Sequence, residues 1–221
     1  MEIAEFGFLF EVEKTRCILK KVLQPDFVLE IPSYVKGRPV TDIGEYAFAG
    51  CRDVATLMLP PTLSNIRAFA FAESEFKDIK REINQKSPIL YVDRFAFADC
   101  TQLGSIIFGG ATFLEASGYQ FKGCTNLNHV DSLNIRGLIP IGAFECCGLY
   151  MFVFSAGSKI AFNAFKDTNL GMAFFAGNIG NTSNFFHTHK NVKIICEENN
   201  PLTDMVYEGY EVAIKERKQV V

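Results

Sequence analysis

The nine residues from Ile43 to Cys51 read Ile-Gly-Glu-Tyr-Ala-Phe-Ala-Gly-Cys, and much of the remaining chain repeats variants of this phrase. Apolar residues follow it at Val54, Leu57 and Leu59. The phenylalanine of the phrase recurs every 21 to 26 residues, at Phe48, Phe71, Phe97, Phe121, Phe144, Phe165 and Phe186. A period in the twenties is typical of a solenoid, in which each unit buries its apolar face only by stacking on its neighbours.

Each repeat has two halves with different local patterns. In the half that ends at Leu59, apolar residues alternate with others, which predicts a short β-strand with one buried face. Pro60-Pro61 then stops the strand, because proline cannot donate to a ladder. The half from Ile43 to Cys51 is too short for a standard helix, so we expect a helical or 3₁₀ turn that places Phe48 in the core. The two halves predict an α/β solenoid: a right-handed coil of about seven rungs, with a parallel β-sheet on one face and short helical or 3₁₀ turns on the other.

The segments 31–60 and 95–108 carry the most specific form of the repeat. Both contain Phe, then Cys, then spaced aliphatic residues, and the first segment ends in Leu-Pro. This pattern resembles the repeat I-G-x-x-A-F-x-x-C-x-x-L-x-x-I-x-I-P of BspA-like leucine-rich-repeat proteins, and the similarity extends from about Ile31 to Cys196. The resemblance implies a non-catalytic solenoid from a family often found on bacterial or protist surfaces, where it binds host or matrix proteins. The chain departs from the family pattern by inserting Glu82–Leu90 in the second repeat.

The repeats divide the chain into three parts. Residues 1–38 are expected to form an N-terminal cap and the segment that leads into the repeats, because Phe6–Val12 alternates as a strand does and can form a hairpin with Cys17–Val22. Residues 39–196 hold the leucine-rich repeats. Residues 197–221 become polar and charged, and Asn199-Asn200-Pro201 marks the end of the last strand. We expect a C-terminal cap there, with a helix over Thr203–Lys218, and a disordered tail is the alternative.

Charge and motif content argue against several classes of protein. A formal charge of −3 gives no basic footprint for nucleic acid. The start of the chain is acidic and its apolar run is short, whereas a secretory signal needs about 7–15 apolar residues and a membrane span about 20. A cytoplasmic location is therefore favoured, and a cell-surface or secreted location is the alternative that the family resemblance implies. No phosphate-binding loop, nucleophile elbow or metalloprotease helix motif is present, so we do not expect an enzyme.

Four of the seven cysteines follow their phenylalanine by three residues and should form one internal column. They are Cys51, Cys100, Cys124 and Cys147. Disulfides between Cys100 and Cys124 or between Cys124 and Cys147 are conceivable, because adjacent rungs lie within reach. Buried free thiols are the favoured interpretation, since free cysteine packs as a small apolar residue and the cysteine count is odd. A zinc site at His187, His189 and Cys196 is short of ligands, so we expect neither a metal nor a cofactor.

Two positions in each strand point away from the predicted core. In the second repeat these positions hold Asp78 and Lys80. The expected partner-binding residues are Thr56, Met58, Ser105, Ile107, His129, Asp131, Met151, Val153, Met172 and Phe174. An idle face would be polar, whereas many of these residues are apolar, so we expect the face to bind a protein partner. By the family resemblance that partner is a host or matrix protein. A structural or self-associating unit, a homo-oligomer without a separate ligand, is the alternative. His129 and Asp131 have no nucleophile beside them and are interpreted as polar surface.

Overall fold

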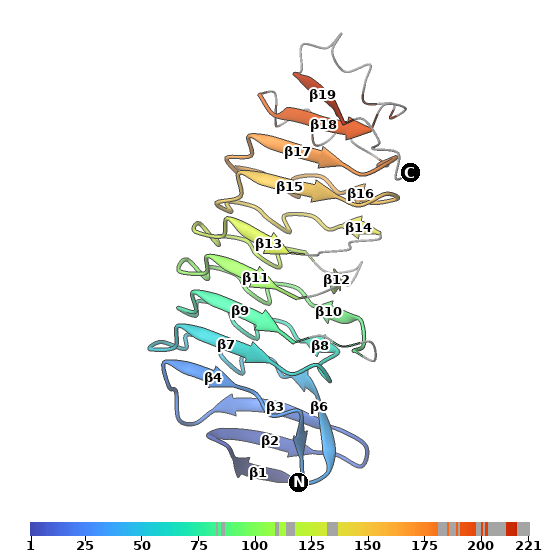
Figure 1. The fold of residues 1–221 in the computed structure, drawn as a ribbon. Coiled ribbons are helices and arrows are strands. Elements are labelled where there is room, and N and C mark those ends of the chain that lie inside the picture. Colours follow the sequence, from blue (N-terminus) through green and yellow to red (C-terminus); the bar gives the residue numbers. More distant parts are fainter. Residues whose placement is uncertain are drawn as a thin grey trace.

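The chain forms an elongated β-solenoid in a computed structural model (Figure 1). The structure describes residues 1–82, 84, 87–108, 111–113, 118–131, 137–180, 185, 189, 191–197, 200, 202 and 211–215. About seven turns stack in sequence order, so that each rung contacts the rung before it and the rung after it. This is the parallel β-solenoid that the repeat period predicts.

The strand half of each repeat contributes to one face. Five strands form a parallel sheet there: β4 (Val28–Glu30), β7 (Thr56–Leu59), β9 (Asp78–Arg81), β11 (Ser105–Ile107) and β13 (His129–Asp131). Four more continue along the solenoid: β15 (Met151–Phe154), β17 (Met172–Phe175), β18 (Lys193–Glu197) and β19 (Val212–Lys215). Inward and outward side chains alternate along these strands, as in β15, where Phe152 and Phe154 are buried and their neighbours are exposed. The predicted alternation is confirmed.

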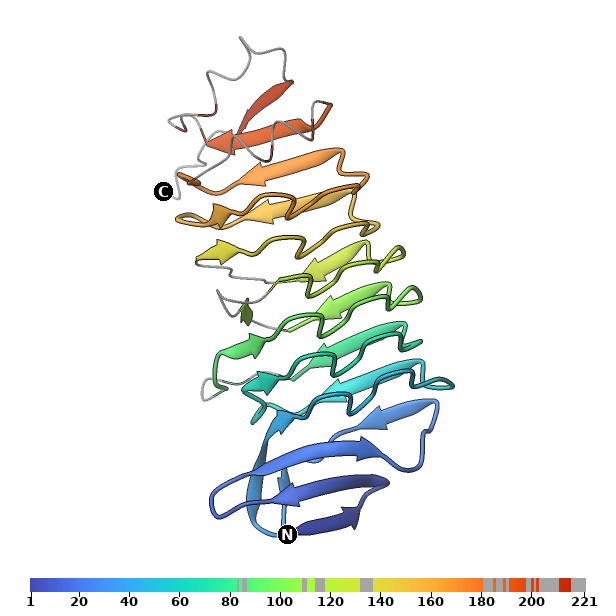
Figure 2. The same cartoon turned by 180° about the vertical axis from the view of Figure 1, so that it is seen from behind.

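A second set of short parallel strands lies across the core from the first, and the sequence analysis did not predict it. It consists of β6 (Arg38–Ile43), β8 (Asn65–Ile66), β10 (Leu90–Val92) and β12 (Ala111–Phe113), followed by the pair β14 (Leu138–Ile139) and β16 (Lys159–Ile160). Figure 2 shows these strands from behind. Each of them is two or three residues long, except β6, and such segments are too short to show a periodicity in the sequence.

The half of each repeat from the glycine to the cysteine forms successive turns, where the sequence analysis expected a helical or 3₁₀ turn. In the first copy, the N–H of Ala47 donates to Gly44 O (3.3 Å) and the N–H of Cys51 to Phe48 O (3.0 Å). Within the first of these turns, Tyr46 has a left-handed backbone with φ +58°. A left-handed residue stops helical propagation, and the N–H of Phe48 donates instead to Ala70 O in the next rung (2.7 Å). Among the described turn segments, N–H groups therefore bond to the next rung, and none of these segments forms a helix.

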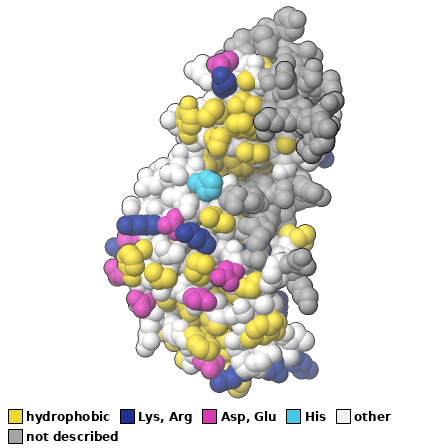
Figure 3. All heavy atoms as spheres, in the orientation of Figure 1, with side chains coloured by type: hydrophobic (Ala, Val, Ile, Leu, Met, Phe, Trp, Pro, Cys, Tyr) yellow, Lys and Arg dark blue, Asp and Glu magenta, His cyan; other side chains and the backbone are white. Residues whose placement is uncertain are grey.

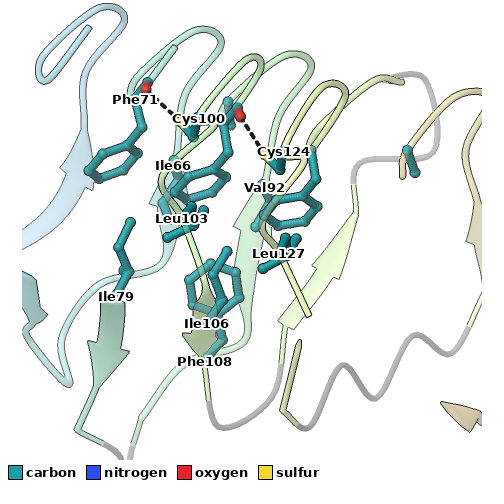
Figure 4. Packing of buried hydrophobic residues seen from close by; sticks show 14 of the residues in the cluster. Ile66, Phe71, Ile79, Val92, Cys100, Leu103, Ile106, Phe108, Cys124 and Leu127 are labelled. Atoms are coloured by element: carbon teal, nitrogen blue, oxygen red, sulfur yellow. Dashed lines mark hydrogen bonds between the residues drawn. The ribbon is translucent and has the colours of Figure 1, made fainter. Parts of the chain in front are cut away.

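The recurrent phenylalanines form a buried stack along the solenoid axis, as expected. The rings of Phe48 and Phe71 lie 4.9 Å apart with an interplanar angle of 5°, and those of Phe71 and Phe97 lie 4.8 Å apart at 6°. The stack continues through Phe121, Phe144 and Phe165 at centroid separations of 5.0 to 5.4 Å. Figure 4 shows how Leu103, Ile106 and Phe108 pack beside this stack. Phe186 lies outside the described residues, and Phe185 is buried against Phe165.

An antiparallel sheet lies at the N-terminal end of the second set of strands. β2 (Phe8–Val12) and β3 (Cys17–Val22) form the predicted hairpin, β1 (Glu2–Glu5) adds a third strand, and β3 pairs in parallel with β6. A short β5 (Tyr34–Val35) also pairs with β6. The buried carboxylate of Asp42 joins the hairpin to the repeats, because it accepts hydrogen bonds from Arg16 (3.2 Å) and from Arg67 (3.0 Å).

The C-terminal part differs from the expected helix over residues 203–218. Residues 212–215 form strand β19, which pairs in parallel with β18 and extends the sheet by one strand. Val212 and Ile214 are β-branched and alternate with other residues, which favours a strand once the edge of β18 is available for pairing. Residues 203–210 and 216–221 lie outside the described part of the chain.

Candidate interaction surface

The register of the strands arranges the outward residues in two columns. The first column contains Thr56, Asp78, Ser105 and His129 on β7 to β13, then Met151, Met172 and Lys193 on β15 to β18. The second contains Met58, Lys80, Ile107 and Asp131, then Val153, Phe174 and Ile195. Only the backbone of Asp131 is described. The ten predicted residues therefore lie on these strands, in two hydrogen-bonded ladders rather than one continuous ladder.

The two ladders differ in chemical character. On β7 to β11 the outward residues are mainly polar, and the hydroxyl of Ser105 donates to the carboxylate of Asp78. On β15 and β17 all four outward residues are apolar. Met151 is 44% exposed and Val153 is 54% exposed, while Met172 and Phe174 are half-buried by their neighbours. Figure 3 shows these apolar side chains as a patch towards the C-terminal end of this face.

Two residues that the sequence analysis did not name extend this apolar patch. Tyr150, just before β15, is 55% exposed, and its ring covers Gly171 in the next rung. A Cβ at Gly171 would lie 2.3 Å from that ring, so only glycine leaves room for it. Ile195 continues the second column on β18 beside Phe174. Gly171 was the signal in the sequence that could have identified Tyr150, because an isolated glycine at a strand often marks a place where another group approaches the backbone closely.

A ladder of four stacked rings on the turn face was also missed. Tyr46, Phe69, Phe95 and Tyr119 stand two residues before the buried phenylalanines, at centroid separations of 5.1 to 5.3 Å and interplanar angles below 10°. All four have a left-handed backbone, with φ between 53° and 62°, which is uncommon for bulky residues. Because each interior ring is covered on both faces by its neighbours, the ladder stabilises the turns rather than offering ring faces to a ligand.

The internal cysteines act as hydrogen-bond donors within the core. The Cys100 thiol donates to Phe71 O and the Cys124 thiol to Phe97 O, both at 3.0 Å (Figure 4), and all seven cysteines are free thiols. A hydrogen bond with Cys124, together with burial, raises the pKa of Cys100 well above its ordinary value. Burial likewise raises the pKa of Cys124. A thiol with a raised pKa is a poor nucleophile at neutral pH.

His189, one of the two histidines considered for a zinc site, lies in the core. The ring of His189 contacts the hydroxyl of Thr168 (3.0 Å) and the carbonyl of Phe185 (3.1 Å), and burial lowers its pKa. His187 lies outside the described residues. Within the described part of the chain, no group of three or more His, Cys, Asp or Glu side chains could hold a metal ion.

The repeats match a known protein family over most of their length. Six copies of the BspA type leucine rich repeat region match residues 28–112 and 80–193, which together cover more than half of the chain. The chain belongs to the BspA type leucine-rich repeat family. Proteins with leucine-rich repeats generally mediate protein–protein interactions and are typically non-enzymatic. No curated protein matches the sequence.

Two solved leucine-rich repeat structures are similar in fold. A leucine rich cell surface protein from Faecalibacterium prausnitzii has a TM-score of 0.55 and 19% identity, over 79% of this chain and 54% of that protein. This chain therefore spans about half the length of that protein. A leucine rich repeat protein from T. pallidum has a TM-score of 0.53 and 17% identity, over 98% of this chain and 100% of that one. At these identities the likeness shows the fold alone. No helix among the described residues is long and apolar enough to span a membrane.

Proposed function

We propose that this leucine-rich repeat chain is a non-catalytic recognition module that binds a protein partner through the outward face of its strands. The observation that carries the proposal is the apolar patch that Met151, Val153, Met172, Phe174 and Ile195 form on a hydrogen-bonded ladder, with Tyr150 just before it. A contiguous exposed apolar patch marks an interaction site more often than it marks idle surface. A sheet also fixes the backbone of these residues before binding, which removes the backbone part of the entropic cost of binding.

The ten outward residues take different parts in this proposal. Met151, Val153, Met172 and Phe174 supply the buried centre of the contact, because truncating central apolar anchors commonly costs about 2 kcal/mol or more. Thr56, Met58, Ser105, Ile107, His129 and Asp131 form the more polar flank, which contributes register and specificity. The name of the similar F. prausnitzii protein, a cell surface protein, is compatible with a partner outside the cell, such as a host or matrix protein.

Val153→Glu tests the proposal against a matched control. Val153 is 54% exposed on the strand face, and Phe162 is 56% exposed on the turn face. We expect Val153→Glu and Phe162→Glu to leave the melting temperature within a few degrees of the parent, because neither side chain is buried in the solenoid. Partners captured from the source organism by the parent are purified and titrated against each variant. We expect Val153→Glu to weaken the measured binding at least about tenfold and Phe162→Glu to leave it unchanged.

The alternative function is self-association through the same patch, without a separate ligand. Sedimentation of the isolated protein distinguishes the two, because a homo-oligomer has a multiple of the monomer mass that Val153→Glu reduces. Two results together would contradict both functions for this face: the parent is a monomer, and its purified partners bind Val153→Glu as tightly as they bind the parent.

A further inference from the structure

The five-stranded sheet ends at β4, and no described strand pairs with the outer edge of β4. β3 and β4 lie in the same turn of the solenoid, because β3 pairs with β6 and β4 pairs with β7 of the next turn. The hairpin continues beyond β3, where β2 pairs with it. Figure 1 shows β4 as the last strand of its sheet towards the N-terminal end. The hairpin therefore extends the second set of strands, and the edge of the five-stranded sheet stays free of pairing with any described strand.

Hydrogen bonds to β7 show which backbone groups of β4 point to the free edge. The C=O of Phe27 accepts the N–H of Ala55 (2.9 Å). The N–H of Ile31 donates to Met58 O (3.0 Å). Alternate residues of a strand direct their N–H and C=O groups to opposite sides, so the odd-numbered residues of this segment face β7.

Val28 and Glu30 consequently direct their backbone groups away from β7. Within the described part of the chain, no residue bonds to the N–H or C=O of either one. Unpaired N–H and C=O groups on an edge strand are a template for pairing with a further strand. An antiparallel strand would exchange two hydrogen bonds with Val28 and two with Glu30, and would thus satisfy all of these groups.

The side chains at this edge leave it accessible. Phe27 is 67% exposed and Val28 is 56% exposed, and Leu23 just before them is exposed as well. Natural proteins usually protect an edge strand with lysine, with proline or with a bulge. β4 has none of these and presents apolar side chains instead. Its composition therefore favours pairing rather than preventing it.

The charges at this edge indicate which kind of strand fits it. The carboxylates of Asp26 and Glu30 are exposed, and neither has an ion pair within the described part of the chain. Residues 24–32 contain no lysine or arginine, so a second copy that paired through its own β4 would add two more carboxylates and no cation. Opposite charges on facing residues of neighbouring strands stabilise a sheet, and like charges destabilise it. A strand with basic residues is therefore complementary to this edge, and a second copy is not.

We propose that the free edge of β4 binds an extended peptide segment of a partner, which adds as an antiparallel strand with the pattern basic, any, apolar, any, basic. Backbone hydrogen bonds to Val28 and Glu30 supply the affinity. Specificity comes from an apolar residue opposite Val28 and from basic residues opposite Glu30 and next to Asp26. This site lies on a different ladder from the apolar patch on β15, β17 and β18, so each can bind without the other.

The test uses the short blocked peptide Thr-Lys-Thr-Val-Thr-Lys-Thr and two matched peptides. Glutamate replaces both lysines in the first matched peptide. In the second the valine carries an N-methyl group, which keeps every side chain and removes the backbone donor to Val28 O. Binding to the isolated protein is followed by NMR shifts and by hydrogen exchange of the backbone amides.

Three protein variants complete the test. Val28→Pro removes an N–H that β7 does not use, and an edge strand tolerates proline at such a position. Glu30→Lys reverses the charge at the edge. Glu45→Lys is the matched control, because Glu45 is exposed on the turn face and has no ion pair within the described part of the chain.

We expect the lysine peptide to slow hydrogen exchange at the amides of Val28 and Glu30. Val28→Pro and the N-methylated peptide should each weaken binding about tenfold, because a backbone hydrogen bond is lost and its partner stays unsatisfied. Glu30→Lys should weaken binding about fivefold. Glu45→Lys should bind as the parent does. If Val28→Pro does not fold, the N-methylated peptide with the parent protein decides the same point.

Three results would each overturn the proposal. The first is a peptide that binds without protecting the amides of Val28 and Glu30. The second is equal affinity for the glutamate peptide or the N-methylated peptide. The third is an isolated protein that sediments as a dimer with these amides already protected, which is the result expected of a second copy at this edge. Val153→Glu should bind the peptide as the parent does, so failure of the proposed function leaves this test unchanged.

Discussion

Each buried phenylalanine contributes to stability through its own burial and through the two rings stacked on it. Phe97 is fully buried, and its ring lies between those of Phe71 and Phe121 at 4.8 and 5.0 Å. Removing such a ring leaves a cavity that the rung spacing prevents from closing, because the hydrogen bonds between rungs fix that spacing. The free energy that is lost on truncating a phenylalanine of this stack therefore depends on how rigid the backbone around it is.

Phe97→Ala should lower the free energy of unfolding by about 3–5 kcal/mol, the usual cost of truncating a buried ring. Chemical denaturation followed by circular dichroism measures it. Phe162→Ala, at an exposed position, is the control and should change the free energy by no more than about 0.5 kcal/mol. Equal stability of Phe97→Ala and the parent would be incompatible with the buried stack.

At the scale of elements, single polar side chains reinforce the connections that the backbone ladders make between segments. The guanidinium of Arg81 occupies an inward position of β9 where β7 has Leu59, and it donates to Leu63 O (2.7 Å) and Pro88 O (2.8 Å). Burial lowers the pKa of this arginine. Through these bonds Arg81 fastens the end of the inserted segment to the preceding rung. Asp42 has the corresponding role between the N-terminal hairpin and the first two rungs.

Asp42→Asn should detach the hairpin from the repeats in part. The substitution leaves Arg16 and Arg67 without their shared carboxylate. Because both arginines are partly exposed, we expect the free energy of unfolding to fall by about 1–3 kcal/mol, which is less than the full cost of breaking a buried pair. Hydrogen exchange should show the larger loss of protection in β2 and β3 than in β15 and β17. The control is Glu11→Gln, which removes the exposed pair with Lys20 (3.4 Å) and should cost less than about 1 kcal/mol. A loss spread evenly over all strands would exclude a local role for Asp42.

At the scale of the whole molecule, the solenoid has one continuous core that runs its full described length. Each rung is stabilised by its two neighbours, so the exposure of a central residue requires several rungs to separate. The buried thiols can be used to measure this exposure. Cys100, Cys124, Cys147 and Cys196 lie in different rungs, Cys17 lies in the N-terminal hairpin, and all five are buried.

Thiol titration at pH 7 should therefore give two reactive groups in the native protein, Cys51 and Cys146, and seven after unfolding without reductant. Burial excludes the reagent from the buried groups, and the raised pKa values of Cys100 and Cys124 also lower the thiolate fraction of these two thiols. Cys51→Ser with Cys146→Ser should remove the two native-state groups and leave five after unfolding. A count of three or fewer in the unfolded parent would indicate disulfides and overturn the free-thiol assignment.

The sequence by itself determined the repeat, the inward phenylalanine stack, the alternation of the strands and the positions that face outwards. These follow from residue type and spacing alone, since the recurrent apolar residues of the repeat must be buried together and each strand has a period of two. Tertiary structure decided the rest. The turn segments became inter-rung ladders rather than helices, because their N–H groups find carbonyl partners one repeat away. The strands of the second set (β6, β8, β10, β12, β14 and β16) and strand β19 form only where the edge of a neighbouring strand is available.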